Sequence, residues 1–352
     1  MLLYAYIRIN SCLRAKWSQN KTMTERTQKI TITRRTAPQP NGACDHISSE
    51  YTRSDRLAAW KARWGINRNS WRIKPGLYAL GAPAADSPVF ATANYKLSFD
   101  ALRTSLKGLN AWLLVLDTKG INVWCAAGKG TFGTMELARV IAETGLEKKV
   151  RHRNIILPQL GAPGISAHRV KAYTGFSVVY GPVRAEDLPE YLRLGGATPE
   201  MRRVRFNLCD RMVLAPVQLV HFGRYMLPAA ALLYVLGFRA DAAYTAGALF
   251  AGGALVPALL PWLPGRSFAV KSAVAGLLVT ALIAVGHYHG AAQFAARALI
   301  YGSAASFVGL DFTGASTYTS LSGVKKEMRL ALPAHAGAFA AGLAILAAWR
   351  FL

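Results

Sequence analysis

Ala111-Trp-Leu-Leu-Val-Leu116 is an uninterrupted apolar run, and it is followed along the chain by Met135-Glu-Leu-Ala-Arg-Val-Ile-Ala-Glu-Thr144. The short apolar run is typical of a strand buried on both faces, whereas the second pattern favours a helix. Further short apolar runs lie at 154–157 and 176–180. Strands that alternate with helices predict an α/β domain with a mostly parallel sheet, covered on both faces and able to bind ligands at the carboxyl ends of its strands.

Composition divides the 352 residues into three segments. The net charge of +24 and the 52% hydrophobic content exclude a disordered chain or a small disulfide-stapled domain. Residues 1–55 are predicted to form a basic tail, 56–211 the α/β domain, and 212–352 an apolar domain. No nucleic-acid partner is expected, because a solvated or membrane-adjacent segment explains the charge of the tail equally well. The first residues are too short for a signal peptide, and a start codon downstream of Met1 is compatible with the pattern.

Long apolar stretches predict five transmembrane spans, near 212–238, 242–262, 267–286, 291–310 and 331–352. Each has about 20 residues, enough to cross a hydrocarbon core of ~30 Å. Arg266 and Lys271 flank the second connection, and Lys325, Lys326 and Arg329 flank the fourth, which predicts that both connections face the cytoplasm. This orientation predicts a multi-pass protein of the cytoplasmic (inner) membrane, with the α/β domain in the cytoplasm and the C-terminus outside. The polar loop 311–329 is expected to contact the α/β domain or a partner.

The metal-ligating residue types do not form a cluster in the sequence. The cysteines are far apart and lack a C-x-x-C pair: Cys12, Cys44, Cys125 and Cys209. The histidines at 152, 168, 287 and 289 are not spaced as a metal site. Any iron-sulfur cluster must therefore come from a partner.

The most informative motif is Asn122-Val-Trp-Cys-Ala-Ala-Gly-Lys129, followed by Gly130-Thr-Phe-Gly-Thr134. A phosphate-binding P-loop is excluded, since its first glycine would fall on Val123. The match of 128–133 to G-x-G-x-x-G leaves a dinucleotide site open, and a buried structural cysteine is the remaining simple interpretation. The alternation of residues 121–127 is compatible with a strand that runs into a glycine loop.

This motif closely resembles the signature of the mercury-methylating corrinoid proteins, and further segments are similar to that family: Thr92-Ala-Asn-Tyr-Lys96, Pro158-Gln-Leu-Gly-Ala-Pro163, Gly181-Pro-Val-Arg184 and 311–328. The resemblance implies a Rossmann-like corrinoid-binding α/β domain followed by an all-α domain of five spans. It implies a corrinoid-dependent methyltransferase that transfers methyl from cobalt to Hg(II) and forms methylmercury. The related corrinoid iron-sulfur proteins carry a cluster-binding cysteine motif that this sequence lacks, and a membrane-tethered corrinoid methyl carrier in folate-linked one-carbon metabolism is the alternative.

The resemblance also implies the cofactor and the partners. Cobalamin would be bound with Cys125, on a short helix, as the lower axial ligand of cobalt, and a ferredoxin-like protein with two [4Fe-4S] clusters would be the reductant. The methyl donor is not identified, with a methyltetrahydrofolate-linked source as one option. A thiolate is a strong electron donor, which suits the electrophilic acceptor Hg(II).

The expected cofactor-binding residues come from the motif and the similar segments: Thr92, Asn94, Tyr95, Asn122, Val123, Trp124, Cys125, Ala126, Ala127, Gly128, Lys129, Gly130, Thr131, Gly133, Thr134, Gln159, Gly161, Gly181, Pro182 and Val183. The small residues are expected to admit a flat ring, and Trp124 to pack the element in place. Thr131 and Thr134 either bond the amides of the ring or cap the following helix. Lys129 either acts on the thiol through its charge or is simply solvated.

Overall fold

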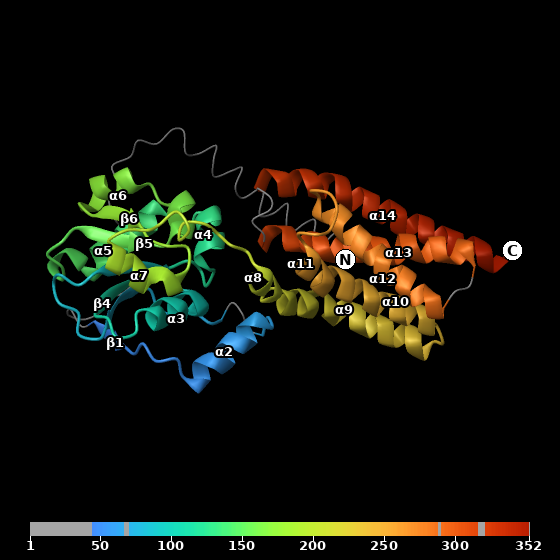
Figure 1. Cartoon of the computed structure of the whole chain (residues 1–352), viewed down its shortest axis with the longest axis horizontal. Helices are drawn as coiled ribbons and strands as arrows, with labels where there is room; N and C mark the ends of the chain where they lie inside the picture. Colours follow the sequence, from blue (N-terminus) through green and yellow to red (C-terminus); the bar gives the residue numbers. More distant parts are fainter. Residues whose placement is uncertain (1–43, 67–69, 288–289, 316–320, 352) are drawn as a thin grey trace. The chain divides into compact units, whose positions relative to one another are not determined.

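The computed structural model describes residues 44–66, 70–287, 290–315 and 321–351, in which an α/β domain precedes a helical region (Figure 1). The strands are β1 (Asp45–Ile47), β2 (Gly76–Leu80), β3 (Val89–Ala93), β4 (Ala111–Leu116), β5 (Asn154–Leu157) and β6 (Ser177–Tyr180). The α-helices of this domain are α2 (Arg53–Arg63), α3 (Lys96–Ser105), α4 (Val123–Lys129), α5 (Thr134–Thr144), α6 (Ala167–Thr174) and α7 (Leu188–Leu194). Short 3₁₀ turns are η1 (Leu146–Lys148), η2 (Gln159–Gly164) and η3 (Ala185–Asp187).

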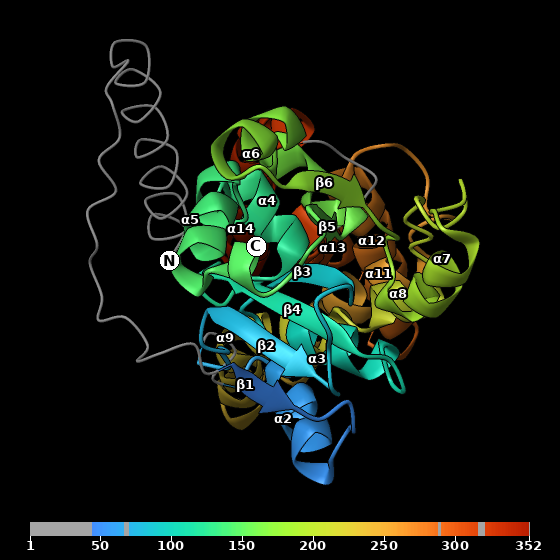
Figure 2. The same cartoon turned by 90° about the vertical axis from the view of Figure 1, so that its left-hand side faces the viewer.

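The strands form one sheet in the order β1-β2-β4-β3-β5-β6, as Figure 2 shows. The pairings are parallel except for β2 with β4, which run antiparallel. The prediction of a mostly parallel sheet is therefore confirmed, except that β1 and β2, parallel to each other, run opposite to the other four strands. The strand ends of β3, β4, β5 and β6 point to one edge of the sheet, where parallel α/β sheets bind ligands.

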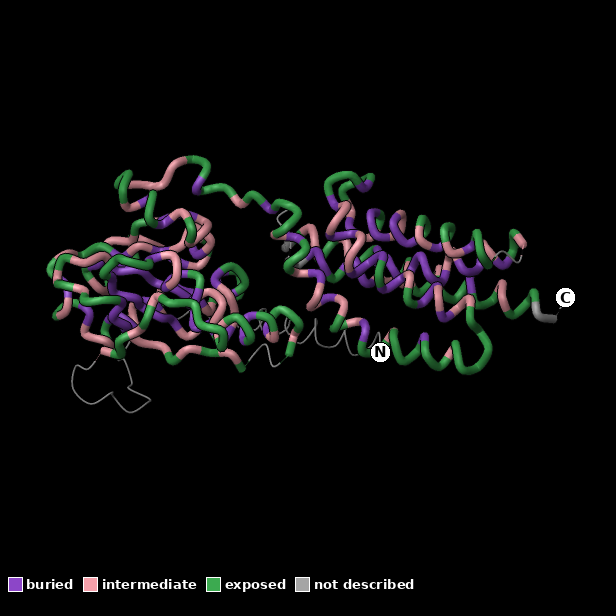
Figure 3. The backbone as a smooth tube through the Cα atoms, turned by 60° about the horizontal axis from the view of Figure 1, so that its bottom comes forward, coloured by how far each residue is buried: buried purple, intermediate pink, exposed green. Residues whose placement is uncertain are grey.

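Alternate residues of the strands supply two separate cores. In β4, Trp112 and Leu114 pack with α4, α5 and α6 on one face, whereas Leu113 and Val115 pack with α3 and α7 on the other. This alternation follows from the two-residue repeat of an extended chain. Figure 3 shows buried residues gathered in the interior of the α/β domain, and all six residues of β4 are among the buried ones.

The sequence patterns located most of these elements. The apolar runs at 111–116 and 154–157 are β4 and β5, and the run at 176–180 contains β6. The predicted helix at 135–144 is α5, which buries Leu137, Val140 and Ile141 and ends at Gly145 with φ of 59°. The predicted tail falls mostly on residues 1–43, outside the described residues, but its last part contains β1 and the start of α2.

The helical region consists of α8 (Leu208–Met212), α9 (Ala215–Val235), α10 (Arg239–Phe250), α11 (Val256–Leu259), α12 (Phe268–Gly286), α13 (Ala291–Leu310) and α14 (Leu321–Phe351). The π-helical turn η4 (Ala251–Leu255) joins α10 to α11, and the 3₁₀ turn η5 (Asp311–Ala315) follows α13. Small residues bring these helices close together. A Cβ atom on Gly276 would lie 2.6 Å from Cβ of Ala305, so α12 and α13 approach closely where glycine stands.

Three helical segments of the described chain are long and apolar enough to cross a membrane: Arg239–Leu259, Phe268–Gly286 and Ser322–Trp349. The helices α9 and α13 occupy the other two positions predicted as spans, but they carry polar side chains within their length, such as Arg224 and Arg297. An α/β domain followed by a helical region is therefore confirmed.

The polar loop predicted at 311–329 is shorter than expected. The helix α14 begins at Leu321 and already contains Lys325, Lys326 and Arg329, and η5 occupies 311–315. The prediction was wrong for 321–329 because the polar residues that suggested a loop lie on the first turns of a long helix. Residues 316–320, where Thr317, Thr319 and Ser320 stand, lie outside the described residues.

Candidate functional site

The cysteine motif forms the short helix α4, whose two ends are fixed by local chemistry. Asn122 is its N-cap, and the Oδ1 atom of Asn122 accepts a hydrogen bond of 2.9 Å from the backbone N–H of Cys125. The helix ends at Gly130, which has φ of 80°, a conformation that glycine adopts without strain. Residues 121–127 are therefore helical from Val123 onward, and the alternative of a strand is wrong.

The faces of α4 differ from the expectation. Ala126 and Ala127 are 0% and 6% exposed and pack into the core beneath the helix, so they offer no surface to a ligand. Trp124 and Cys125 are exposed, so neither belongs to the core beneath the helix, and the packing role expected of Trp124 stays a prediction. The surface of α4 that a ligand can reach is thus formed by the exposed side of the motif, which includes the thiol of Cys125.

Glycines allow the turn η2 to pack directly beneath α4. A Cβ atom on Gly164 would lie 2.1 Å from the carbonyl oxygen of Phe132 and 3.1 Å from Cα of Ala127, and one on Gly161 would lie 2.6 Å from the ring of Phe132. Gly128, by contrast, has no atom within 4 Å of the position of a Cβ. Glycine is required at 161 and 164 by packing, whereas at 128 it leaves open space on the surface of a helix.

The loop that leads into α4 is organised by Asn94. Its Oδ1 atom accepts hydrogen bonds from the backbone N–H groups of Thr118 and Gly120, each at 3.0 Å, and its Nδ2 atom donates to Asp117 at 3.1 Å. Burial alone would raise the pKa of Asp117, but hydrogen bonds from Lys119 and from Asn94 hold that pKa below its ordinary value. Asn94 was expected at the cofactor, and the structure shows it 3% exposed as the anchor of this loop.

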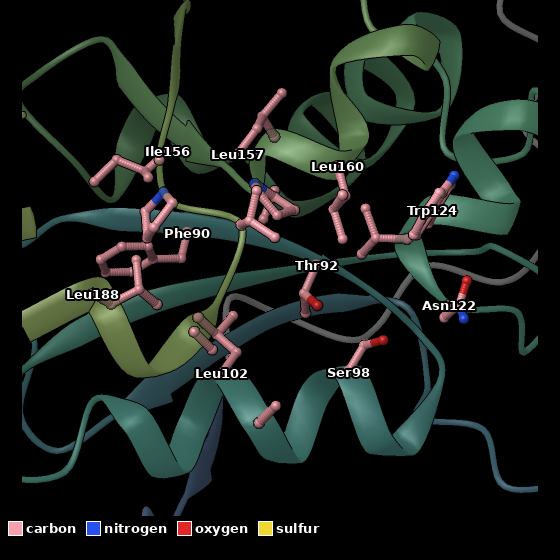
Figure 4. Close-up of a pocket in the computed structure, with 18 residues that line it drawn as sticks. Phe90, Thr92, Ser98, Leu102, Asn122, Trp124, Ile156, Leu157, Leu160 and Leu188 are labelled. Atoms are coloured by element: carbon pink, nitrogen blue, oxygen red, sulfur yellow. The ribbon is translucent and has the colours of Figure 1, made fainter. Parts of the chain in front are cut away.

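A cavity of about 250 Å³ opens beside α4 at the carboxyl edge of the sheet. Figure 4 shows Trp124 and Asn122 at one end of it, Thr92 and Ser98 along one wall, and Phe90, Leu102 and Leu188 toward the other end. The walls are mostly apolar, and the hydroxyl and amide groups are few. This composition is typical of ligand pockets, in which a few polar groups set orientation.

The structure brings about one third of the predicted site residues to this cavity. Those that line it are Thr92, Asn122, Val123, Trp124, Gly181, Pro182 and Val183. Tyr95 is buried in the core, while Gly133 would place a Cβ 2.8 Å from the carbonyl oxygen of Gly130 and so serves packing. Lys129 is exposed in the last turn of α4.

The two threonines of the motif do not cap α5. The N-cap of α5 is Gly133, with no side-chain cap. The Oγ1 atom of Thr134 accepts a hydrogen bond of 2.8 Å from the backbone N–H of Ser166, and that of Thr131 lies 3.4 Å from the carbonyl oxygen of Ala126. Capping is therefore the wrong interpretation of Thr134, which ties α5 to the start of α6.

Sequence reasoning missed Ser98 and Leu102, which line the cavity from α3. They are four residues apart and so share one face of the helix. That helix begins just after β3, whose carboxyl end is at the site. The position of α3 directly after β3 was therefore the sequence signal that could have predicted Ser98 and Leu102 at the site.

The described residues hold no group of three or more His, Cys, Asp or Glu side chains that could bind a metal ion. Cys44, Cys125 and Cys209 are free thiols on separate elements, and Cys12 lies outside the described residues. His152 contacts the carbonyl oxygen of Ser87 at 2.9 Å, which is a structural role.

The site fits a wide, flat ligand of the corrinoid type. The exposed Cys125 thiol and the open surface at Gly128 leave room for a ring against α4. The Oε1 atom of Gln159 is buried and has no hydrogen-bond partner in the described protein, so it is available to an amide donor of a ligand. The cavity itself is small beside such a ring, which points to a ligand that lies on an open surface with one part in the cavity.

Comparison with known proteins shows what this domain is similar to. Residues 66–192 match the family model described as CdhD: CO dehydrogenase/acetyl-CoA synthase delta subunit. The matched region runs from before β2 into α7 and includes every element around the cavity, whereas β1, α2 and the helical region lie outside it.

Curated relatives match this chain over a similar number of residues. The gamma subunit of the acetyl-CoA decarbonylase/synthase complex of Methanopyrus kandleri is 34% identical over 131 residues, 37% of this chain and 28% of the relative. The same subunit of Archaeoglobus fulgidus is 36% identical over 118 residues, 33% and 25% of the two chains. The corrinoid/iron-sulfur protein large subunit of Moorella thermoacetica is 29% identical over 124 residues, 35% and 27%. The chain thus spans about a quarter of the length of these relatives.

Proposed function

We propose that the chain is a membrane-anchored, corrinoid-dependent methyltransferase that transfers a methyl group to Hg(II) and forms methylmercury. The single observation that carries this proposal is the exposed Cys125 thiol on a capped helix, inside a domain whose relatives include a corrinoid protein. The motif around Cys125 supports the more specific part, the acceptor.

The residues that would hold cobalamin are those on the exposed side of α4 and at the cavity. Asn122 fixes the first turn of α4 and so holds Cys125 at the surface. Gly128 leaves the helix surface free, while Thr92, Ser98 and the buried Gln159 Oε1 offer polar contacts to amide groups. A bound corrinoid supplies a cobalt ion that carries and releases a methyl group. Cys125 would hold the cobalt through its thiolate and would donate electron density to it, which would favour delivery of the methyl group to an electrophile such as Hg(II).

The anchoring belongs to the same proposal. Three described segments meet the length and hydropathy of a span, and we infer that α9 and α13 complete a set of five. Lys325, Lys326 and Arg329 stand together on the first turns of α14, which favours a cytoplasmic position for that end. The α/β domain would then be cytoplasmic and the C-terminus outside, at the inner membrane. A ferredoxin-like protein with two [4Fe-4S] clusters would supply electrons, and the methyl donor would be folate-linked or of another kind.

A second function is favoured by the names of the relatives. Acetyl-CoA decarbonylase/synthase gamma subunits and a corrinoid/iron-sulfur protein match this domain. A membrane-tethered corrinoid methyl carrier in folate-linked one-carbon metabolism would use the same cavity and need no Hg(II).

The test substitutes Cys125 in the full chain and measures methylmercury in cells together with the optical and EPR spectra of the cobalamin-loaded protein. Cys125→Ala and Cys125→Ser are expected to lower methylation on the order of a hundredfold or more. Changes to residues that only contact a metal ligand already cost roughly 10–100-fold in metal affinity or activity. The matched control is Cys209→Ala, which removes another exposed thiol from a short helix and should leave activity unchanged. Near-normal methylation by Cys125→Ala would refute the role of the thiolate. Sulfur ligation in the spectra without methylation of Hg(II) would favour the carrier.

A further inference from the structure

The helix α2 is packed in the reverse of the usual way. Its small residues Ala58, Ala59 and Ala62 are 4%, 5% and 1% exposed, whereas Leu57 and Trp60 are both 53% exposed. Surface helices ordinarily bury their large apolar residues and expose small or polar ones. The large apolar side chains Leu57 and Trp60 are therefore more than half exposed to solvent in the described protein.

This orientation of α2 is fixed by ion pairs on its inner side. The carboxylate of Asp55 accepts hydrogen bonds from Lys96 and from Arg103 of α3, each at 2.7 Å. Thr52 and Asp55 also form a capping box at the first turn. A rotation that buried Trp60 would break this arrangement, so the outward face is set by the fold.

The exposed face of α2 carries both aromatic and cationic side chains. Leu57, Trp60 and Trp64 are spaced three and four residues apart and so form one stripe, and the rings of Trp60 and Trp64 are 5.7 Å apart. Basic residues flank the stripe or stand beside it: Arg53, Arg56, Lys61 and Arg63. Tryptophan beside Lys and Arg is typical of helices that lie at the surface of a bilayer, where rings enter the headgroup region and cations meet anionic lipids.

We propose that α2 binds the anionic phospholipid surface of the membrane that anchors the chain, with Leu57, Trp60 and Trp64 in the headgroup region. This inference rests on the proposed anchoring by the helical region. The N-terminal residues 1–43 are a poorer occupant of this face, because they are rich in Lys and Arg and contain Glu25 as their acidic residue, so their charge repels the basic flanks. The helix also precedes the segment that matches the CdhD family model, so the likeness to the relatives does not account for its exposed face.

The test uses the full chain in lipid nanodiscs, with the native cysteines changed to serine and one spin label at a time. Labels are placed by Trp60→Cys on α2, by Lys107→Cys on the exposed loop after α3, and by Leu278→Cys on the outer side of α12. Power-saturation EPR compares access of oxygen, which enters the bilayer, with access of a water-soluble nickel chelate. Discs of phosphatidylcholine alone are compared with discs that contain phosphatidylglycerol.

In anionic discs, the oxygen-to-nickel ratio at residue 60 should be on the order of threefold above that at residue 107, and it should fall in zwitterionic discs because the basic flanks lose their partner. Arg56→Glu, Lys61→Glu and Arg63→Glu together should abolish the difference between the discs. A lipid reading at 278 with a fully aqueous reading at 60 overturns the inference and leaves the anchoring intact. An aqueous reading at 278 overturns the anchoring and the inference with it. An aqueous residue 60 that becomes protected when a protein partner is added would show a protein-docking face and equally overturn the lipid assignment.

Discussion

The helices α2 and α4 both bury alanines and expose an aromatic residue, but the surfaces that they present differ. The exposed side of α4 carries small side chains at Gly128 and Cys125 with one basic residue, Lys129, in the last turn, which suits a flat, rigid molecule. The exposed side of α2 is bulky and cationic, with two tryptophans and several basic residues, which suits a fluid, anionic surface. In both cases contacts on the inner face of the helix fix which side chains point outward. Beneath α4 these contacts are made by packed glycines, and beneath α2 they are ion pairs.

The packing beneath α4 can be broken by one methyl group. Gly164→Ala places a Cβ 2.1 Å from the carbonyl oxygen of Phe132, so η2 must move away from α4. We expect the free energy of unfolding to fall by about 3 kcal/mol, at the upper end of ordinary overpacking, with a lower melting temperature of the full chain in detergent.

Gly128→Ala is the matched control for that substitution, because its Cβ would meet no atom within 4 Å. It should stabilise α4 slightly, by up to about 1 kcal/mol, and yet weaken retention of cobalamin. Equal destabilisation by the two alanines would contradict the assignment of packing to Gly164 and of open surface to Gly128.

The cap of α4 provides a smaller effect. Asn122→Ala removes the acceptor for the N–H of Cys125 and should cost about 1 kcal/mol, measured as a shift of the thermal transition. Asn122→Asp keeps an oxygen at the same place and should restore stability. If both variants melt like the parent chain, the hydrogen bond does not define the helix start.

The ion pairs beneath α2 predict the smallest effect, a dependence on pH. Burial by itself would raise the pKa of Asp55, but hydrogen bonds from Lys96, Thr52 and Arg103 outweigh it and hold that pKa well below its ordinary value. A carboxyl with a lowered pKa contributes stability above its unfolded pKa, near 4, and loses this contribution as the pH falls further. The protection of the amide hydrogens in 53–63 against exchange, taken relative to the intrinsic exchange rate at each pH, should therefore fall below about pH 4.

The control for this prediction is Asp86, whose carboxylate pairs with Arg151 while both side chains are largely exposed. Asp86→Asn should leave exchange in 53–63 unchanged, whereas Asp55→Asn should raise it at neutral pH. Protection in 53–63 that is independent of pH in the parent chain, once corrected for the intrinsic exchange rate, and unaffected by Asp55→Asn would show that the alanine contacts alone hold α2.

The sequence predicted strands of the α/β domain where they are short, mostly apolar runs. β4 and β5 have the predicted bounds. The reversed direction of β1 and β2 was not predictable, since pairing direction depends on the path of the chain between strands and not on the residues within them.

The candidate site was predicted in part for the same reason. The motif located Cys125, and the structure shows that thiol on the surface of α4, but the motif could not show that Ala126 and Ala127 face the core. Which side chains face the core depends on whether the motif is a helix or a strand. Asn122 caps a helix here, so the side chains follow the helical repeat and not the alternation of a strand. The outward face of α2 was missed because Leu57, Trp60 and Trp64 have the spacing of an ordinary buried stripe.

The helix α3 lies between the two surfaces and is part of both. Lys96, Asp100 and Arg103 hold α2, while Ser98 and Leu102 line the cavity. One helix thus carries side chains of both surfaces. By thermodynamic reciprocity, if contact of α2 with lipid changes the affinity of the cavity for its ligand, then ligand binding changes the affinity of α2 for lipid by the same factor. Binding of a ligand in the cavity would then change how tightly the α/β domain binds the bilayer surface.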